Sequence, residues 1–173
     1  MNISKRTFLT WFLGGLAAFA AVIVLHIPLV TDGVPGGIAD HQSAPDAATV
    51  DRIHAAWQSA GVYTQAHWAI IGDLIFIGIY GVGCVLGGLY FKAKPKRILK
   101  LLGWIALLSG TVFLFTDYGE TIAQFIQLTQ ERGSDGLASF ASTLRPIKMV
   151  TWTSALLAIV AALVIERFST SDA

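Results

Sequence analysis

The chain has 173 residues, of which 54% are hydrophobic and only 13% are charged, and its mean hydropathy is +0.64. A soluble domain carries about 25% charged residues, so this composition excludes a disordered chain and an ordinary soluble enzyme. The net charge of +1 provides no basic face for nucleic acid. The single cysteine, Cys84, excludes an intramolecular disulfide, a CxxC redox site and a thiolate zinc cluster. We therefore expect an integral membrane protein.

Four apolar segments are long enough to cross a bilayer as helices, which takes about 20 residues each. They cover approximately 7–30, 66–91, 98–127 and 146–166. Helices are the expected form because lipid offers no hydrogen-bond partners to the backbone. The predicted fold class is therefore all-α, a four-transmembrane-helix up-down bundle that forms a single membrane domain over 1–173.

The longest segment outside the predicted spans is the first outer loop, 31–65. Within it, 46–60 is predicted to form a short amphipathic helix that ends at Gly61. Val50 and Trp57 fall on the apolar face of this helix at helical spacing. Two interpretations are open, a lid over a cavity and an interfacial spacer at the membrane surface, and the pattern favours the spacer because such helices need no ligand.

The second outer loop, 130–145, precedes the fourth predicted span. Pro146 suits the first turn of a helix, where its missing amide hydrogen costs nothing. We therefore predict that the fourth span begins at Pro146, with Ser142 or Thr143 as its cap.

The distribution of lysine and arginine predicts the orientation in the membrane. Cytoplasmic loops carry the excess of these residues. The side that includes both termini and the loop between the second and third spans holds eight of them, and the opposite side holds four. We therefore expect a multi-pass protein of the cytoplasmic (inner) membrane with both termini in the cytoplasm. The eight are Lys5, Arg6, Lys92, Lys94, Lys96, Arg97, Lys100 and Arg167, and the four are Arg52, Arg132, Arg145 and Lys148.

Several ionisable residues lie inside the predicted spans, where they are costly and are functional candidates by default. Asp73 lies in the second span, and Asp117 and Glu120 share one face of the third because they are three residues apart. Lys148 begins the fourth span. All four fall at a similar depth near the outer face, so we expect them to meet there. The complete set of ligand-site or proton-site candidates is Asp73, Asp117, Glu120, Lys148, Tyr80 and Gln124.

This polar cluster has three interpretations: a network that fixes helix packing, a binding or proton-linked site, and a catalytic site. The sequence contains no nucleophile elbow, HExxH motif or P-loop, which argues against an enzyme. We therefore expect a small polytopic membrane protein with a non-catalytic binding or accessory role as a complex subunit. The alternative is a proton-linked small-molecule transporter or a membrane enzyme that uses Asp73, Asp117 and Glu120.

No cofactor is expected from the sequence, and no metal is favoured. His67 and His26 are weak candidates for metal or haem ligands, because His67 and Asp73 are six residues apart and the Glu-x-x-His pattern of di-iron bundles is absent. The expected surroundings are the lipid bilayer and a small-molecule or lipid ligand, without nucleic acid.

Glycines in the second span form faces that allow close helix approach. Gly83 and Gly87 form a GxxxG motif, and Gly81 and Gly88 are one heptad apart. The pattern is explained by packing within the chain, while a homodimer or a larger membrane complex remains open, because a lone GxxxG is weak evidence.

Overall fold

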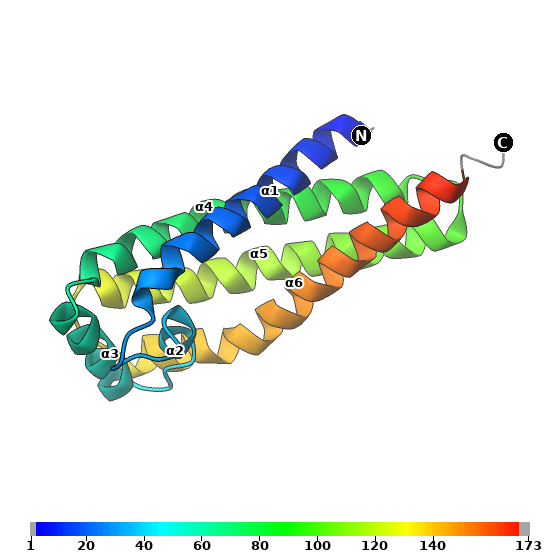
Figure 1. Ribbon diagram of the computed structural model, residues 1–173. Helices are drawn as coiled ribbons and strands as arrows, with labels where there is room; N and C mark the ends of the chain where they lie inside the picture. The colour runs from blue at the N-terminus through cyan, green and yellow to red at the C-terminus, as the bar shows by residue number, and fades with distance from the viewer. Residues whose placement is uncertain (1–2, 170–173) are drawn as a thin grey trace. The chain divides into compact units, whose positions relative to one another are not determined.

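The computed structural model describes residues 3–169, and this part of the chain is helical apart from short connections and one isolated bridge between Thr31 and Val34. Figure 1 shows four long helices and the two short ones, α2 and α3, that lie between α1 and α4 in the chain. The elements are α1 (Lys5–His26), the 3-10 turn η1 (Ile27–Leu29), α2 (Ile38–Gln42), α3 (Ala47–Ser59), α4 (Tyr63–Lys92), α5 (Arg97–Thr129) and α6 (Asp135–Ser169).

The four long helices are those predicted from hydropathy, and each is long and apolar enough to cross a membrane. Half of the residues in the most apolar window of α4 are buried, compared with 22–28% in the corresponding windows of α1, α5 and α6. The helix α4 therefore has the largest buried share of the four, and most residues in the windows of the other three are partly or fully exposed. This all-helical architecture is compatible with a membrane protein.

The predicted start of the fourth helix is wrong. The helix α6 begins at Asp135 and continues through Pro146. Ser142 and Thr143, the predicted caps, lie inside the helix and donate their hydroxyl hydrogens to the carbonyl of Ser139. Packing of the residues before the proline outweighs the missing hydrogen bond. Two residues of this extension are almost fully buried, Ala138 and Ala141.

The chain divides into two compact units. Each of the four long helices contributes one segment to the first unit and one to the second. The first unit contains the described residues up to Leu16, together with 78–115 and the described residues from Lys148 onward. The second unit contains 17–77 and 116–147, and therefore includes η1, α2 and α3. The candidate carboxylates Asp73, Asp117 and Glu120 belong to the second unit, whereas Lys148 and Tyr80 belong to the first.

In the first unit, glycines of α4 lie against the backbones of the neighbouring helices. A Cβ atom at Gly83 would be 2.7 Å from the backbone nitrogen of Phe12 on α1. A Cβ atom at Gly88 would be 2.5 Å from the backbone nitrogen of Leu107 on α5. Both helices therefore approach α4 at positions where only glycine leaves enough space.

In the second unit, residues 31–62, which we call the cap, form a small packed structure around α3. The predicted helix is confirmed: Asp46 caps its N-terminus by accepting a hydrogen bond from the amide of Thr49 at 2.8 Å, and Gly61 follows it with φ +72°. The Thr49 amide also lowers the pKa of Asp46 below its usual value.

The apolar face of α3 packs inside the protein instead of being free to lie on a membrane surface. Val50, Ile53 and Trp57 are at most 1% exposed, and the indole nitrogen of Trp57 donates a hydrogen bond to the carbonyl of Leu29 at 2.9 Å. The remaining buried residues of this core are Leu29, Val34, Ile38, Ala44, Ala66, Ala69, Ile70, Leu128 and Ala138. The interfacial-spacer interpretation does not explain this burial, because the face covers the ends of α1 and α4.

Candidate functional site

The candidate site in the second unit begins with an imidazole–carboxylate pair. His26, at the end of α1, lies with its Nε2 atom 3.1 Å from Oδ2 of Asp73 on α4. Their side chains are 21% and 12% exposed. Gly72 precedes Asp73, and a Cβ atom at this glycine would be 2.8 Å from the side chain of Leu25. The glycine therefore lets α1 and α4 approach closely enough for the pair to form.

A polar face of α5 provides the other two candidate carboxylates. Asp117 is 5% exposed and Glu120 is fully buried. Thr121 donates its hydroxyl hydrogen to Oδ1 of Asp117 at 3.4 Å, and the amide of Gln124 donates to Oε1 of Glu120 at 3.2 Å. These residues follow one another at helical spacing on a single face of α5, as the sequence predicts.

The segments that carry Asp73 and Asp117 lie side by side in the second unit. The hydroxyl of Tyr118 on α5 donates a hydrogen bond to the carbonyl of Leu74 on α4 at 3.1 Å. Each of these two residues directly follows one of the candidate aspartates in the chain. The helices α4 and α5 are therefore neighbours at this level of the second unit.

Lys148 and Tyr80 lie in the first unit. Lys148 is 7% exposed, and its carbonyl accepts a hydrogen bond from the hydroxyl of Thr151. Tyr80 is fully buried, and its hydroxyl donates to the carbonyl of Trp152 at 3.2 Å. Their participation in the same site as Asp73 stays a prediction.

The two weak metal-ligand candidates have different surroundings. His26 contacts Asp73, whereas Nδ1 of His67 lies 3.1 Å from the carbonyl of Tyr63, one turn earlier on α4. Because a carbonyl only accepts, the proton of His67 lies on Nδ1. Within residues 3–169, no group of three or more histidine, cysteine, aspartate and glutamate side chains is arranged to hold a metal ion.

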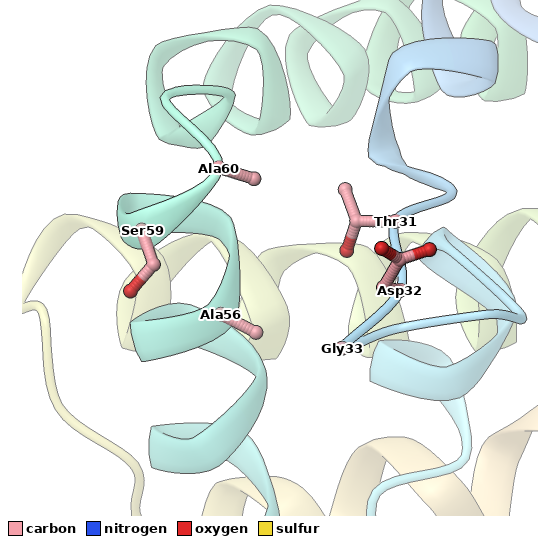
Figure 2. Close-up of a pocket in the computed structure, with 6 residues that line it drawn as sticks. All are labelled: Thr31, Asp32, Gly33, Ala56, Ser59 and Ala60. Atoms are coloured by element: carbon pink, nitrogen blue, oxygen red, sulfur yellow. The ribbon is translucent and has the colours of Figure 1, made fainter.

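A hollow of about 510 Å³ lies in the cap, away from the predicted candidates. Figure 2 shows Thr31 and Asp32 on one side of it and Ala56 and Ala60 of the α3 end on the other. Its lining contains one charged group, the exposed carboxylate of Asp32. The sequence analysis did not predict this hollow, because no pattern brings the turn at Thr31 to the end of α3.

The structure also contains a buried histidine pair that the sequence analysis missed. Nε2 of His41 on α2 lies 3.1 Å from Nε2 of His54 on α3. His54 lies one residue from Ile53 on the buried side of α3, but α2 has only five residues and gives no periodic signal.

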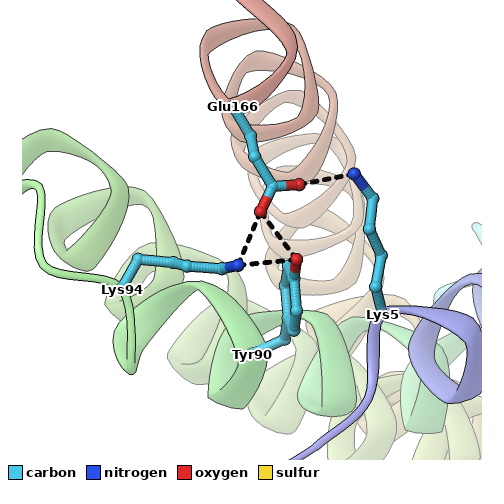
Figure 3. A network of polar contacts seen from close by, with 4 residues as sticks. All are labelled: Lys5, Tyr90, Lys94 and Glu166. Carbon is cyan, nitrogen blue, oxygen red and sulfur yellow. Dashed lines mark hydrogen bonds and ion pairs between the residues drawn. The ribbon is translucent and has the colours of Figure 1, made fainter. Parts of the chain in front are cut away.

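A second missed cluster surrounds Glu166 near the end of α6 (Figure 3). Its carboxylate contacts the ammonium groups of Lys5 at 2.6 Å and Lys94 at 2.7 Å, and it accepts a hydrogen bond from the hydroxyl of Tyr90 at 2.6 Å. Lys94 also donates to the Tyr90 hydroxyl and lies 4.0 Å from the centre of its ring. The two lysines were interpreted only as orientation signals, yet they connect three segments of the first unit.

Comparison of the chain with protein-family models, with curated proteins and with solved structures returned no match.

Proposed function

We propose that this chain is an integral protein of the cytoplasmic membrane, with both termini cytoplasmic, that has a non-catalytic binding or accessory role. The observation that supports this proposal is the burial of ionisable groups among apolar helices. Asp73, Asp117 and Glu120 are each at most 8% exposed on helices that are otherwise apolar enough to cross a membrane. Such groups are costly in a membrane and usually belong to a ligand or ion pathway.

The donor and acceptor groups of the site indicate the chemistry of its ligand. The carboxylates of Asp73, Asp117 and Glu120 accept hydrogen bonds when ionised, and the amide of Gln124 both donates and accepts. A small molecule or lipid headgroup with a positive charge or several N–H or O–H donors would complement this set. The His26–Asp73 contact adds an imidazole, whose ring nitrogens can donate or accept a hydrogen bond.

We expect Asp73→Asn to remove the bound ligand while leaving the fold intact. Asparagine has the shape of aspartate and keeps an oxygen that accepts from His26, but it removes the charge. The measurement is native mass spectrometry of the full chain, gently extracted from its own membrane, together with its melting temperature. We expect an additional mass on the wild type that is lost in the variant, with a melting temperature within about 4 °C of wild type.

The matched control is Asp32→Asn, which removes an exposed carboxylate that lines the hollow in the cap. A bound mass lost in this control but retained in Asp73→Asn would move the ligand to the hollow and contradict the proposal. A wild type without any additional mass, combined with a strongly destabilised Asp73→Asn variant, would assign the carboxylates to helix packing.

Proton-linked transport is the second candidate function, and the His26–Asp73 contact favours it. The Nε2 atom of His26 lies 3.1 Å from Oδ2 of Asp73, so a proton can pass directly between the two side chains. Transport predicts that the compound identified by mass enters proteoliposomes together with protons, and that Asp73→Asn abolishes both fluxes. A binding or accessory role predicts binding without flux.

A further inference from the structure

The histidine pair lies in the core of the cap, away from the carboxylates of the proposed site. His41 is 2% exposed and His54 is 3% exposed. The ring of His41 packs against Trp57 with the ring centres 5.3 Å apart, and the ring of His54 packs edge-on to Tyr63 at 5.5 Å. The imidazole contact therefore joins α2 to α3 in the interior of the cap.

The hydrogen-bond inventory of the pair has no place for an additional proton. A bond between two Nε2 atoms needs a hydrogen on one ring and a lone pair on the other. Within residues 3–169, the Nδ1 atoms of His41 and His54 are both buried without a hydrogen-bond partner. A first added proton would therefore occupy an Nδ1 atom that has no acceptor, and a second would break the Nε2–Nε2 bond. Each buried N–H without an acceptor costs about 1–3 kcal/mol.

The pKa values of the two histidines also favour the neutral state of the pair. Burial, together with the neighbouring His54, lowers the pKa of His41 to about 3. Burial lowers the pKa of His54 to about 4, with Asp51 opposing this shift and His67 adding to it. The titratable and charged groups on the elements packed around the pair are Asp40, Asp46, Asp51, Arg52, Tyr63, His67, Glu131, Arg132 and Asp135.

Three of these carboxylates accept hydrogen bonds from backbone amides. Asp51 accepts from the amide of Gly133, Asp40 accepts from that of Gly36, and Asp135 accepts from that of Ala47. These hydrogen bonds tie the three carboxylates to the backbone of the second unit. None of these three bonds directs a carboxylate to an Nδ1 atom of the pair.

We propose that the His41–His54 pair is a proton-binding switch that holds the cap closed at neutral pH and opens the contact between α2 and α3 on acidification. The lowered pKa values determine the direction in which pH shifts the equilibrium between the closed and the open cap. Each imidazole binds a proton more readily in the open cap, where its pKa returns towards 6.5, so the closed form is favoured above that pH and disfavoured as the pH falls towards 4. With two protons bound on opening, the rise of the opening constant approaches about a hundredfold per pH unit near pH 5, well below 6.5 and above the lowered pKa values.

Hydrogen exchange of the full chain in lipid nanodiscs measures this opening constant directly. The protection of amides in 38–60 is followed from pH 7 to pH 5, after correction for the pH dependence of the intrinsic exchange rate, with 78–92 of α4 as the internal reference. We expect the slope of the logarithm of the opening constant against pH to steepen from pH 7 and to approach about −2 per pH unit near pH 5 in the cap, and to stay at about 0 in the reference. If the wild-type protein shows the same amide protection of the cap at pH 7 and pH 5, this result by itself overturns the proposal.

Variants assign the protons to the pair. We expect His54→Gln to reduce the slope to about −1 and the double variant His41→Gln/His54→Gln to reduce it to about 0. The matched controls His67→Gln and His26→Gln remove the two other histidines and should keep the slope near −2. If a control variant loses the slope as His54→Gln does, the protons do not bind to this pair. If the protection of the cap depends on added EDTA, a metal ion and not a proton controls the opening. Either outcome would overturn the proposal.

Discussion

Alanine at Gly88 is expected to destabilise the protein by about 2 kcal/mol, whereas alanine at Gly87, the adjacent residue, is expected to leave its stability near that of the wild type. A Cβ atom at Gly88 would lie 2.5 Å from the backbone nitrogen and 2.7 Å from the Cα atom of Leu107, so α4 and α5 would have to separate. Such overpacking costs about 1–3 kcal/mol or more, and the better helix propensity of alanine recovers only about 1 kcal/mol.

Gly87 is the matched control because it lies in the same turn of the same helix. A Cβ atom there meets only the ends of two side chains, Ile159 at 3.2 Å and Phe8 at 3.3 Å, which can move by the small distance required. The measurement is the unfolding free energy of the two variants in the same detergent, from a denaturant titration. Equal effects of Gly87→Ala and Gly88→Ala would contradict the assignment of Gly88 to the helix contact.

The two remaining glycines of the predicted face allow the contrast to be extended. Alanine at Gly83 meets the backbone of Phe12 and should behave like the Gly88 variant. Alanine at Gly81 meets the side chain of Leu114, whose flexible end can move, so an intermediate loss is expected. The sequence pattern predicted close approach at all four glycines, but only the structure distinguishes backbone contacts from side-chain contacts.

Hydropathy was sufficient to predict the four long helices, because a continuous apolar run of this length has few other stable forms. It failed at the start of α6, where Pro146 is a strong local signal for a helix start. The burial of Ala138 and Ala141 shows that tertiary packing decided this boundary. Such packing involves residues far apart in the sequence and leaves no local pattern.

The candidate site was predictable to a similar extent. The polar face of α5 follows from spacing alone, and the neighbouring position of α4 follows from the short connection between the two helices. The contact of His26 with Asp73 was not predicted, because it requires the relative rotation of α1 and α4. The histidine pair of the cap was missed for a related reason: α2 is too short for its periodicity to be recognised, and its position depends on the packing of α3.

Removal of the Glu166 carboxylate is expected to cost about 2 kcal/mol in Glu166→Gln and more in Glu166→Ala. The side chain is 11% exposed and connects Lys5, Lys94 and Tyr90. Loss of one member of a fully buried charge pair costs about 3–5 kcal/mol. The smaller value applies here because the side chains of Lys5 and Lys94 are 47% and 29% exposed, so water replaces part of the lost interaction. Glutamine keeps an acceptor for the Tyr90 hydroxyl, which alanine removes.

The two lysines provide an internal comparison within the network. Lys5→Met should cost less than about 1 kcal/mol, since exposed ion pairs contribute little. Lys94→Met should cost more, because Lys94 is less exposed and also contacts the hydroxyl and the ring of Tyr90. The measurement is the unfolding free energy of Glu166→Gln, Glu166→Ala, Lys5→Met and Lys94→Met at low and at high salt. We expect the effect of Lys5→Met to vanish at high salt. If Lys5→Met lowers the unfolding free energy as much as Glu166→Gln does, the contributions of the two lysines do not follow their exposure. In that case α1 is the principal partner of this carboxylate.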